Sequence, residues 1–208
     1  MNQSNGQQKR VKGPWLGFEL GNWAYKYFDP GFTGYTVSLD YEKDLRYYPV
    51  MELGMLNIQK DQEKMDYSTE GYFGKIGVNY NFLDSKGVWD YNILFAGLRL
   101  GFANYQHKAE NIVIENNYFG NYQIGDISNQ NLKALWTEAV VGLRVEVINN
   151  VFLGWSLRGK LRLISDKDKQ LTPYFIPGYG SGEDNSTIRI QYYISYKLPI
   201  IKSDYKDF

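Results

Sequence analysis

Strict alternation of apolar and polar residues constrains this chain more than any other feature of its sequence. Successive side chains of a β-strand point to opposite faces, so an alternating segment predicts a strand with one apolar face and one polar face. The pattern recurs in eight segments, at about Pro14–Gly21, Gly34–Glu42, Tyr47–Leu56, Tyr72–Phe82, Val88–Ala103, Leu135–Val147, Val151–Ile164 and Thr187–Leu198. We therefore predict an all-β fold of eight antiparallel strands.

The connections between these segments alternate between short and long along the chain. Bacterial outer-membrane barrels have this asymmetry, with tight periplasmic turns and longer outer loops. We therefore predict an eight-stranded antiparallel up-and-down transmembrane β-barrel at residues 13–198, with polar periplasmic tails at residues 1–12 and 199–208. The short connections are Lys43–Arg46, Asp84–Gly87 and Ile148–Asn150, and the long ones are Asn22–Thr33, Asn57–Glu70, Asn104–Ala134 and Ser165–Ser186.

The membrane assignment depends on which face of the strands is wet, because alternation alone also fits a soluble barrel or sandwich. Several segments reach about ten residues, the length that a tilted strand needs to cross a bilayer. The chain also contains 19 Tyr, 11 Phe and 5 Trp residues. Many of these aromatic residues stand where strands meet connections, as in the girdles of membrane barrels. One group is Tyr41, Tyr47, Tyr48, Tyr80, Phe82, Trp89, Tyr91 and Tyr196 at the short connections, and the other is Tyr25, Tyr27, Phe28, Phe32, Tyr72 and Tyr105 near the long ones.

The polar face of the predicted strands carries charges of both signs, interspersed with glycines. On a soluble protein this face would be a solvated surface. Inside an eight-stranded barrel it would be a lumen in which opposite charges pair and glycines leave room for long side chains. We favour the lumen, because it explains both the glycines and the equal totals of 23 basic and 23 acidic residues. The predicted lumen charge network comprises Glu19, Asp40, Glu52, Lys75, Arg99, Glu138, Arg144, Glu146, Arg158, Lys160, Arg162 and Arg189.

Two segments, Gly74–Phe82 and Ala96–Phe102, are similar to strands of Bacteroidetes outer-membrane proteins. Over about Pro14–Leu198 the chain resembles the small eight-stranded outer-membrane barrels, the OmpA transmembrane domain and the OmpX type. Its last strand resembles the C-terminal signal read by barrel-assembly machinery, although Pro199–Phe208 follow that strand. The resemblance implies an uncharacterised Bacteroidetes barrel family located in the bacterial outer membrane.

Catalytic chemistry has little support in the sequence. Two groups of small barrels that resemble this chain in architecture modify lipid A, and both need a histidine near the outer rim with a serine or a carboxylate. The single histidine, His107, shares the longest predicted loop with Glu110, Glu115 and Ser128. No spacing ties these residues together, so we interpret His107 as a solvated loop residue and predict that the chain is not an enzyme.

Cofactor, metal and nucleic-acid binding are not predicted either. The chain has no cysteine, which removes thiolate ligands. Asp166 and Asp168 begin the last long loop, and Glu183 and Asp184 end it, but these carboxylates lack the spacing of an EF-hand loop. No glycine-rich phosphate loop is present. The formal net charge of zero argues against a nucleic-acid partner.

We expect a closed, non-enzymatic barrel with a structural or protein-interaction role, as a subunit of a larger envelope complex. Its partners would be outer-membrane lipid and an envelope protein, contacted through the outer loops or the periplasmic tails. The aromatic segments Tyr118–Phe119 and Tyr174–Tyr179 would either form such a contact or pack within their own loops. The alternatives are a small pore, a lipid-A-modifying enzyme, and a soluble lipocalin-like binding barrel whose charged face points outward.

Overall fold

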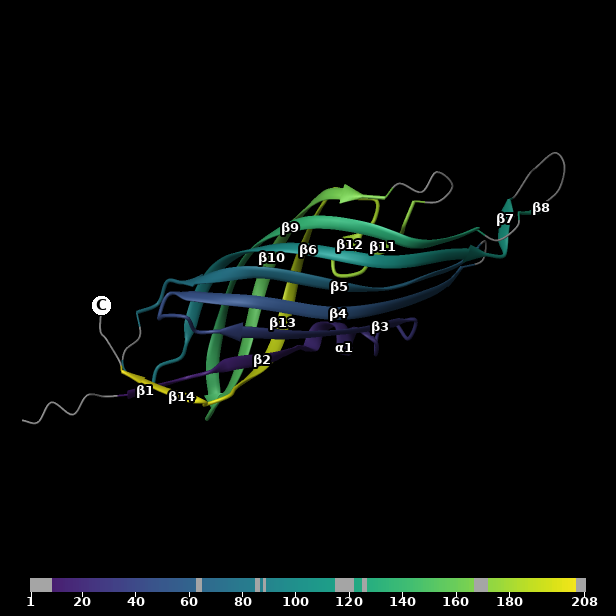
Figure 1. Ribbon diagram of the computed structural model, residues 1–208. Coiled ribbons are helices and arrows are strands. Elements are labelled where there is room, and N and C mark those ends of the chain that lie inside the picture. Colours follow the sequence, from purple (N-terminus) through teal and green to yellow (C-terminus); the bar gives the residue numbers. More distant parts are fainter. Residues whose placement is uncertain are drawn as a thin grey trace, which may run out of the picture.

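Eight strands close into one antiparallel barrel (Figure 1). The computed structural model describes residues 9–62, 65–84, 87, 89–114, 122–124, 127–166 and 172–204. Each barrel strand pairs with the next barrel strand along the chain and the last pairs with the first, which confirms the predicted all-β, up-and-down fold. The barrel strands are β2 (Pro14–Glu19), β3 (Phe32–Tyr41), β4 (Tyr47–Gln62), β5 (Met65–Asn81), β6 (Ile93–Glu110), β9 (Ile127–Ile148), β10 (Val151–Ser165) and β13 (Ser186–Lys197).

Two of the turns at one end of the barrel, the short-turn end, are tight. In the β3–β4 turn the Asp44 carboxylate accepts hydrogen bonds from the backbone N–H groups of Arg46 and Tyr47, at 2.9 and 2.7 Å. The β9–β10 turn contains Asn150 with a φ of 63°, a left-handed conformation that Asn adopts more readily than most residues. The β5–β6 connection is longer than predicted, because β6 begins at Ile93.

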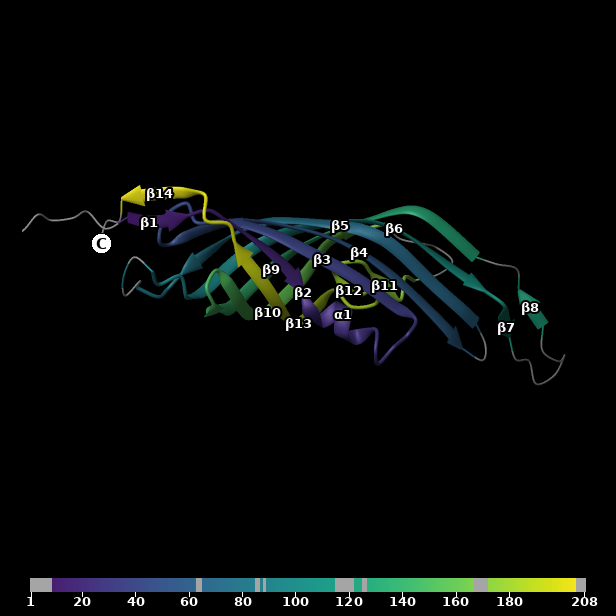
Figure 2. The ribbon, with the colours of Figure 1, turned by 90° about the horizontal axis from the view of Figure 1, so that it is seen from below.

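Four neighbouring strands extend beyond the rest at the opposite end, the long-loop end. Strands β4, β5, β6 and β9 contain 16, 17, 18 and 22 residues, whereas β2 contains 6. They run side by side past the other strands in Figures 1 and 2. The predictions of loops at Asn57–Glu70 and Asn104–Ala134 are therefore largely wrong. In the described part of β6 beyond Ala103, the outward residues Asn104, Gln106 and Lys108 are polar, which makes the alternation hard to recognise in the sequence.

Several short elements are not part of the barrel sheet. Helix α1 (Leu20–Tyr25) begins where β2 was predicted to continue, and within the described residues no helix is long and apolar enough to span a membrane. Parts of the two segments expected as tails pair antiparallel as β1 (Lys9–Lys12) and β14 (Ile201–Asp204). The other short strands form the hairpins β7 (Ile112–Ile114) with β8 (Tyr122–Ile124) and β11 (Phe175–Ile176) with β12 (Gly180–Ser181).

The outward face of the barrel is apolar, and the inward face is largely polar. On β10, for example, Leu153 and Leu157 are exposed whereas the alternate residues Ser156 and Arg158 are buried. We use the name apolar wall for the exposed outward-facing residues Leu16, Val37, Leu39, Met51, Leu53, Ile76, Val78, Leu98, Leu100, Val141, Leu153, Leu157, Leu161, Ile190 and Ile194.

Candidate functional site

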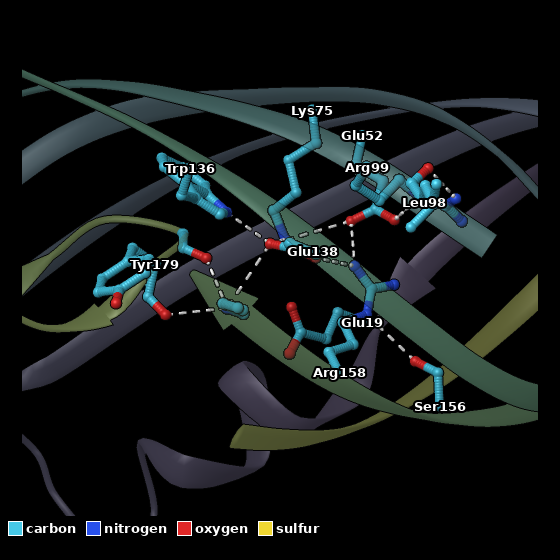
Figure 3. A network of polar contacts seen from close by, with 12 residues as sticks. Glu19, Glu52, Lys75, Leu98, Arg99, Trp136, Glu138, Ser156, Arg158 and Tyr179 are labelled. Carbon is cyan, nitrogen blue, oxygen red and sulfur yellow. Dashed lines mark hydrogen bonds and ion pairs between the residues drawn. The ribbon is translucent and has the colours of Figure 1, made fainter. Parts of the chain in front are cut away.

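Two buried carboxylates, Glu52 on β4 and Glu138 on β9, lie at the centre of the barrel interior (Figure 3). Arg158 on β10 bridges them, with Nη1 2.8 Å from Glu52 Oε2 and 3.3 Å from Glu138 Oε2. Lys75 on β5 bridges the same two groups, with Nζ 3.4 Å from Glu52 Oε2 and 3.2 Å from Glu138 Oε1. Anions and cations from four strands are thus linked across the lumen.

Further donors complete the contacts of these carboxylates. Arg99 Nε lies 3.4 Å from Glu52 Oε1, and Trp136 Nε1 donates to Glu138 Oε1 at 2.7 Å. A buried charge costs several kcal/mol of desolvation unless other charges and hydrogen bonds offset it. The contacts provide that offset, and together they define what we name the central ion network: Glu52, Glu138, Lys75, Arg99, Arg158 and Lys160.

An aromatic cluster around a second ion pair closes the short-turn end of the interior. Arg144 Nη1 donates to both carboxylate oxygens of Asp40, at 2.9 and 2.8 Å. The Arg144 guanidinium carbon lies 4.5 Å from the centre of the Trp15 ring, a cation–π contact. The short-turn cluster consists of Trp15, Tyr48, Tyr91, Ile93, Phe95, Val140 and Phe152.

The last long connection folds into the other end of the interior. Lys160 Nζ donates to the backbone carbonyls of Gly178 and Tyr179, at 2.7 and 3.0 Å. Gly178 has a φ of +74°, and a Cβ there would lie 2.4 Å from Phe73 Cγ. This close approach fits glycine alone. The mouth cluster formed by this connection and the barrel consists of Phe73, Ala103, Tyr105, Ala134, Trp136, Ile176 and Tyr179.

The aromatic segment Tyr174–Tyr179 therefore packs mostly inward. Ile176 and Tyr179 are fully buried, while Tyr174 is half exposed. Of the alternatives left open by the sequence, an exposed contact is excluded for the inward residues of this segment, because the barrel mouth offers them an apolar lining. The other aromatic segment, Tyr118–Phe119, lies outside the described residues.

Little free volume remains between the two clusters. A cavity of about 40 Å³ lies beside Glu52, Arg99, Arg144 and Gln191. Among the described residues, Arg144 Nε and Nη2 and Gln191 Oε1 have no hydrogen-bond partner. A water molecule needs about 10–15 Å³ of such space, so the cavity has room for only a few water molecules. Side chains therefore fill most of the lumen at this level.

Nine of the twelve residues predicted for the lumen network are buried in the interior. The other three are partly buried: Glu146 accepts the Asn150 N–H at 2.7 Å, Arg162 donates to Gly182 O at 2.6 Å, and Arg189 donates to Asn22 Oδ1 at 2.6 Å. The nine are Glu19, Asp40, Glu52, Lys75, Arg99, Glu138, Arg144, Arg158 and Lys160. Two further charges on the predicted polar face, Glu42 and Lys197, are also buried.

Asn22 is a buried polar residue of the interior that the sequence pattern does not reveal. It lies on α1, where a loop was predicted, and its side chain is buried. Its Nδ2 donates to Glu19 Oε2 at 2.8 Å and to Thr36 Oγ1 at 3.3 Å. Its Oδ1 accepts a hydrogen bond from Arg189. Asn22 thereby holds the start of α1 against the lumen charges.

His107 is not the solvated loop residue that we expected. It is 2 % exposed on β6 and points inward, with Nδ1 3.4 Å from the Tyr67 hydroxyl oxygen. Burial raises the pKa of the Tyr67 phenol above its ordinary value. Ser128 pairs with Lys108, the neighbour of His107, so its side chain lies on the opposite face of the sheet.

The candidates for catalysis and metal binding are therefore not brought together in the described part of the chain. Glu110 forms an ion pair with Lys108 on the outward face. No group of three or more His, Asp or Glu side chains in the described residues could hold a metal ion. Glu115 and Asp168 lie outside the described residues.

The two predicted aromatic girdles divide between the surface and the interior. Four members are buried, and these belong to clusters inside the barrel: Tyr48, Tyr91, Phe32 and Tyr105. These residues have inward parity along the strands, so a position near a strand end is not enough to identify a girdle residue. The exposed members are Tyr41, Tyr47, Tyr80, Phe82, Trp89 and Tyr196 at the short-turn end, and Tyr25, Tyr27, Phe28 and Tyr72 toward the long-loop end.

Comparison with known proteins gives one family. Residues 2–203 match DUF6048, which is described as a domain of unknown function. No curated protein matches the chain.

Proposed function

We propose that this chain, which belongs to the DUF6048 family, is a closed, non-enzymatic β-barrel of the bacterial outer membrane with a structural or protein-interaction role. The observation that carries the proposal is the inside-out distribution of side chains. The apolar wall is exposed, whereas the central ion network is buried. A barrel that folds in water has the opposite preference, because burying one Leu or Ile side chain contributes about 1.5–3 kcal/mol.

Insertion into a lipid bilayer would remove the free-energy cost of exposing the apolar wall to water. The apolar wall would face acyl chains, and the exposed aromatic residues would lie near the two headgroup layers. The short-turn end would then face the periplasm together with β1 and β14. The strand extension, by which we mean the part of β4, β5, β6 and β9 that projects beyond the other strands, would face away from the periplasm. The soluble lipocalin-like alternative required a charged outer face, and the buried charges of Glu52 and Arg158 speak against it.

A contact role is the proposal that best fits a filled lumen. The short-turn cluster, the central ion network and the mouth cluster leave a cavity of only about 40 Å³ between them, which argues against the small pore. Contact with an envelope protein would then use the surfaces that project from the barrel. These are the extension of β4, β5, β6 and β9 and the β1–β14 ribbon.

The membrane assignment is tested by tryptophan quenching in lipid vesicles. One variant keeps only Trp155, which is exposed on the apolar wall side of β10, and a matched variant keeps only Trp136, which is fully buried in the lumen. The other tryptophans become phenylalanine. Lipids brominated in their acyl chains should quench Trp155 strongly and Trp136 weakly.

Two results would overturn the assignment. One is equal quenching of both variants in folded protein that shifts on an unboiled gel. The other is a wild-type chain that stays folded and monodisperse in buffer without detergent or lipid.

A further inference from the structure

A groove of about 530 Å³ lies on the outward surface of the strand extension, next to the apolar wall. Two neighbouring rows of residues across β4, β5 and β6 form its floor. In one row Asn57 pairs with Glu70, which pairs with Gln106. In the next row Tyr72 pairs with Asn104. The groove is therefore built on paired strands and not on a loop.

The side chains in the groove offer hydrogen-bonding groups and one exposed ring. The amides of Asn57 and Asn104 form no hydrogen bond within the described residues. The Gln106 amide donates to the Glu70 carboxylate, which fixes both side chains in place. The Tyr72 side chain is 73 % exposed. These polar groups and the exposed ring differ from the neighbouring rows of the apolar wall, which carry Leu, Ile and Val side chains.

A backbone irregularity brings one more amide to the groove. The pairing of β6 with β9 shifts by one residue between Tyr105 and His107. Opposite this shift, Asn131 has a φ of 61° and lines the groove. Bulges of this kind redirect a side chain at the cost of local pairing.

We infer that this groove binds a neutral saccharide. A sugar presents hydroxyl groups that both donate and accept hydrogen bonds, which suits Asn and Gln amides and a carboxylate. The C–H face of a sugar ring is apolar and packs on an exposed aromatic ring such as Tyr72. Rigid strands hold these groups in a fixed arrangement, which lowers the entropy cost of binding.

Other ligand classes fit the groove less well. No Lys or Arg is among its described lining residues, so phosphate groups would meet Glu70 without a cation. An acyl chain would leave the amides of Asn57 and Asn104 unpaired. Two sources could supply the saccharide, a free oligosaccharide or the glycan of a membrane lipid. Only the lipid-borne glycan requires the proposed membrane location. Tyr72 lies one row beyond the apolar wall, where it would be near the lipid headgroups.

The experiment uses the full chain in lipid nanodiscs and two probes. The first probe is a neutral oligosaccharide of hexoses free in solution, and the second is a glycolipid that carries the same neutral glycan, placed in the nanodisc. Tyr72→Ala should weaken binding about tenfold or more, while Tyr72→Phe should retain it to within about threefold, since the ring supplies the contact. Tyr192→Ala, which removes an exposed tyrosine of β13, is the control and should leave binding unchanged.

Each outcome decides the inference. Tyr72-dependent binding of both probes supports a saccharide site with no need of a lipid anchor, and Tyr72-dependent binding of the lipid-borne glycan alone assigns the source to the membrane. No binding of either probe, or binding that Tyr72→Ala leaves intact, overturns the inference. The gel shift of unboiled protein is recorded in the same samples. A barrel that inserts without binding contradicts the groove alone, and folded protein that fails to insert but still binds the free oligosaccharide through Tyr72 contradicts the membrane proposal alone.

Discussion

At the scale of single residues, the interior depends on a few carboxylates that each serve several cations. Glu52 lies within 3.4 Å of donor atoms of Lys75, Arg99 and Arg158. The pairing offsets a desolvation cost that all four groups bear, and removal of the common partner leaves three buried cations with less compensation. The free energy of unfolding is therefore most sensitive at the carboxylates and less so at any one cation.

Glu52→Gln should lower the free energy of unfolding by about 3–5 kcal/mol, the range measured when one partner of a buried ion pair is removed. The measurement is urea-induced unfolding in lipid vesicles, followed by tryptophan fluorescence. Glu183→Gln is the control, because Glu183 is exposed and its substitution should shift the midpoint little. Equal stability of the two variants would show that the network does not hold the barrel together.

The sequence predicts much of this interior because parity along a strand is a strict rule. Once β10 is recognised, Arg158 and Lys160 must point the same way. Parity says nothing of Asn22, because its burial arises from a short helix and from contacts with Glu19 and Arg189. The burial of His107 escapes prediction for a related reason. Its strand continues past the apolar wall, where polar residues on the outward face conceal the alternation.

At the scale of elements, the connection that carries β11 and β12 acts as an inward-folded plug. Its fit depends on Gly178, whose φ and contact with Phe73 both exclude a side chain. No pattern in the sequence predicts this fold, because the segment's aromatic residues are equally suited to an exposed contact. The segment folds inward because Phe73 and Trp136 provide an apolar lining at the mouth.

Gly178→Ala should release this plug while the barrel stays closed. A left-handed conformation costs an Ala residue about 1–2 kcal/mol, and the added Cβ would also meet Phe73. We expect faster proteolysis within residues 172–185 and an unchanged gel shift of the unboiled protein. Gly159→Ala is the matched control, since a Cβ at Gly159 meets no atom within 4 Å. Equal cleavage of both variants would contradict the plug.

At the scale of the whole molecule, three layers fill the lumen in series: the short-turn cluster, the central ion network and the mouth cluster. Loss of one layer leaves the other two in place. The fold could be predicted at this scale because eight strands enclose a space about wide enough for side chains. The length of the strand extension could not, since it lies beyond the apolar face that reveals each strand.

Wild-type protein in planar lipid bilayers should therefore show no single-channel conductance. Gly178→Ala should also show no conductance, because the central ion network and the short-turn cluster still fill the lumen. Fluorescence of the inserted protein confirms that it is present in the bilayer. Stable conductance steps in the wild type would favour a pore instead.

The brevity of β2 has a consequence for how the barrel assembles. This strand pairs through five residues with β3 and five with β13, whereas β4 and β5 pair through sixteen. Its two partners, β3 and β13, lie far apart in the sequence, so the barrel cannot close before β13 is in place. Without that contact the sheet has two unpaired edges. Because long-range contacts form slowly, we expect closure to limit the rate of folding, and we expect a chain that ends before Ser186 to lack the strand that closes the barrel.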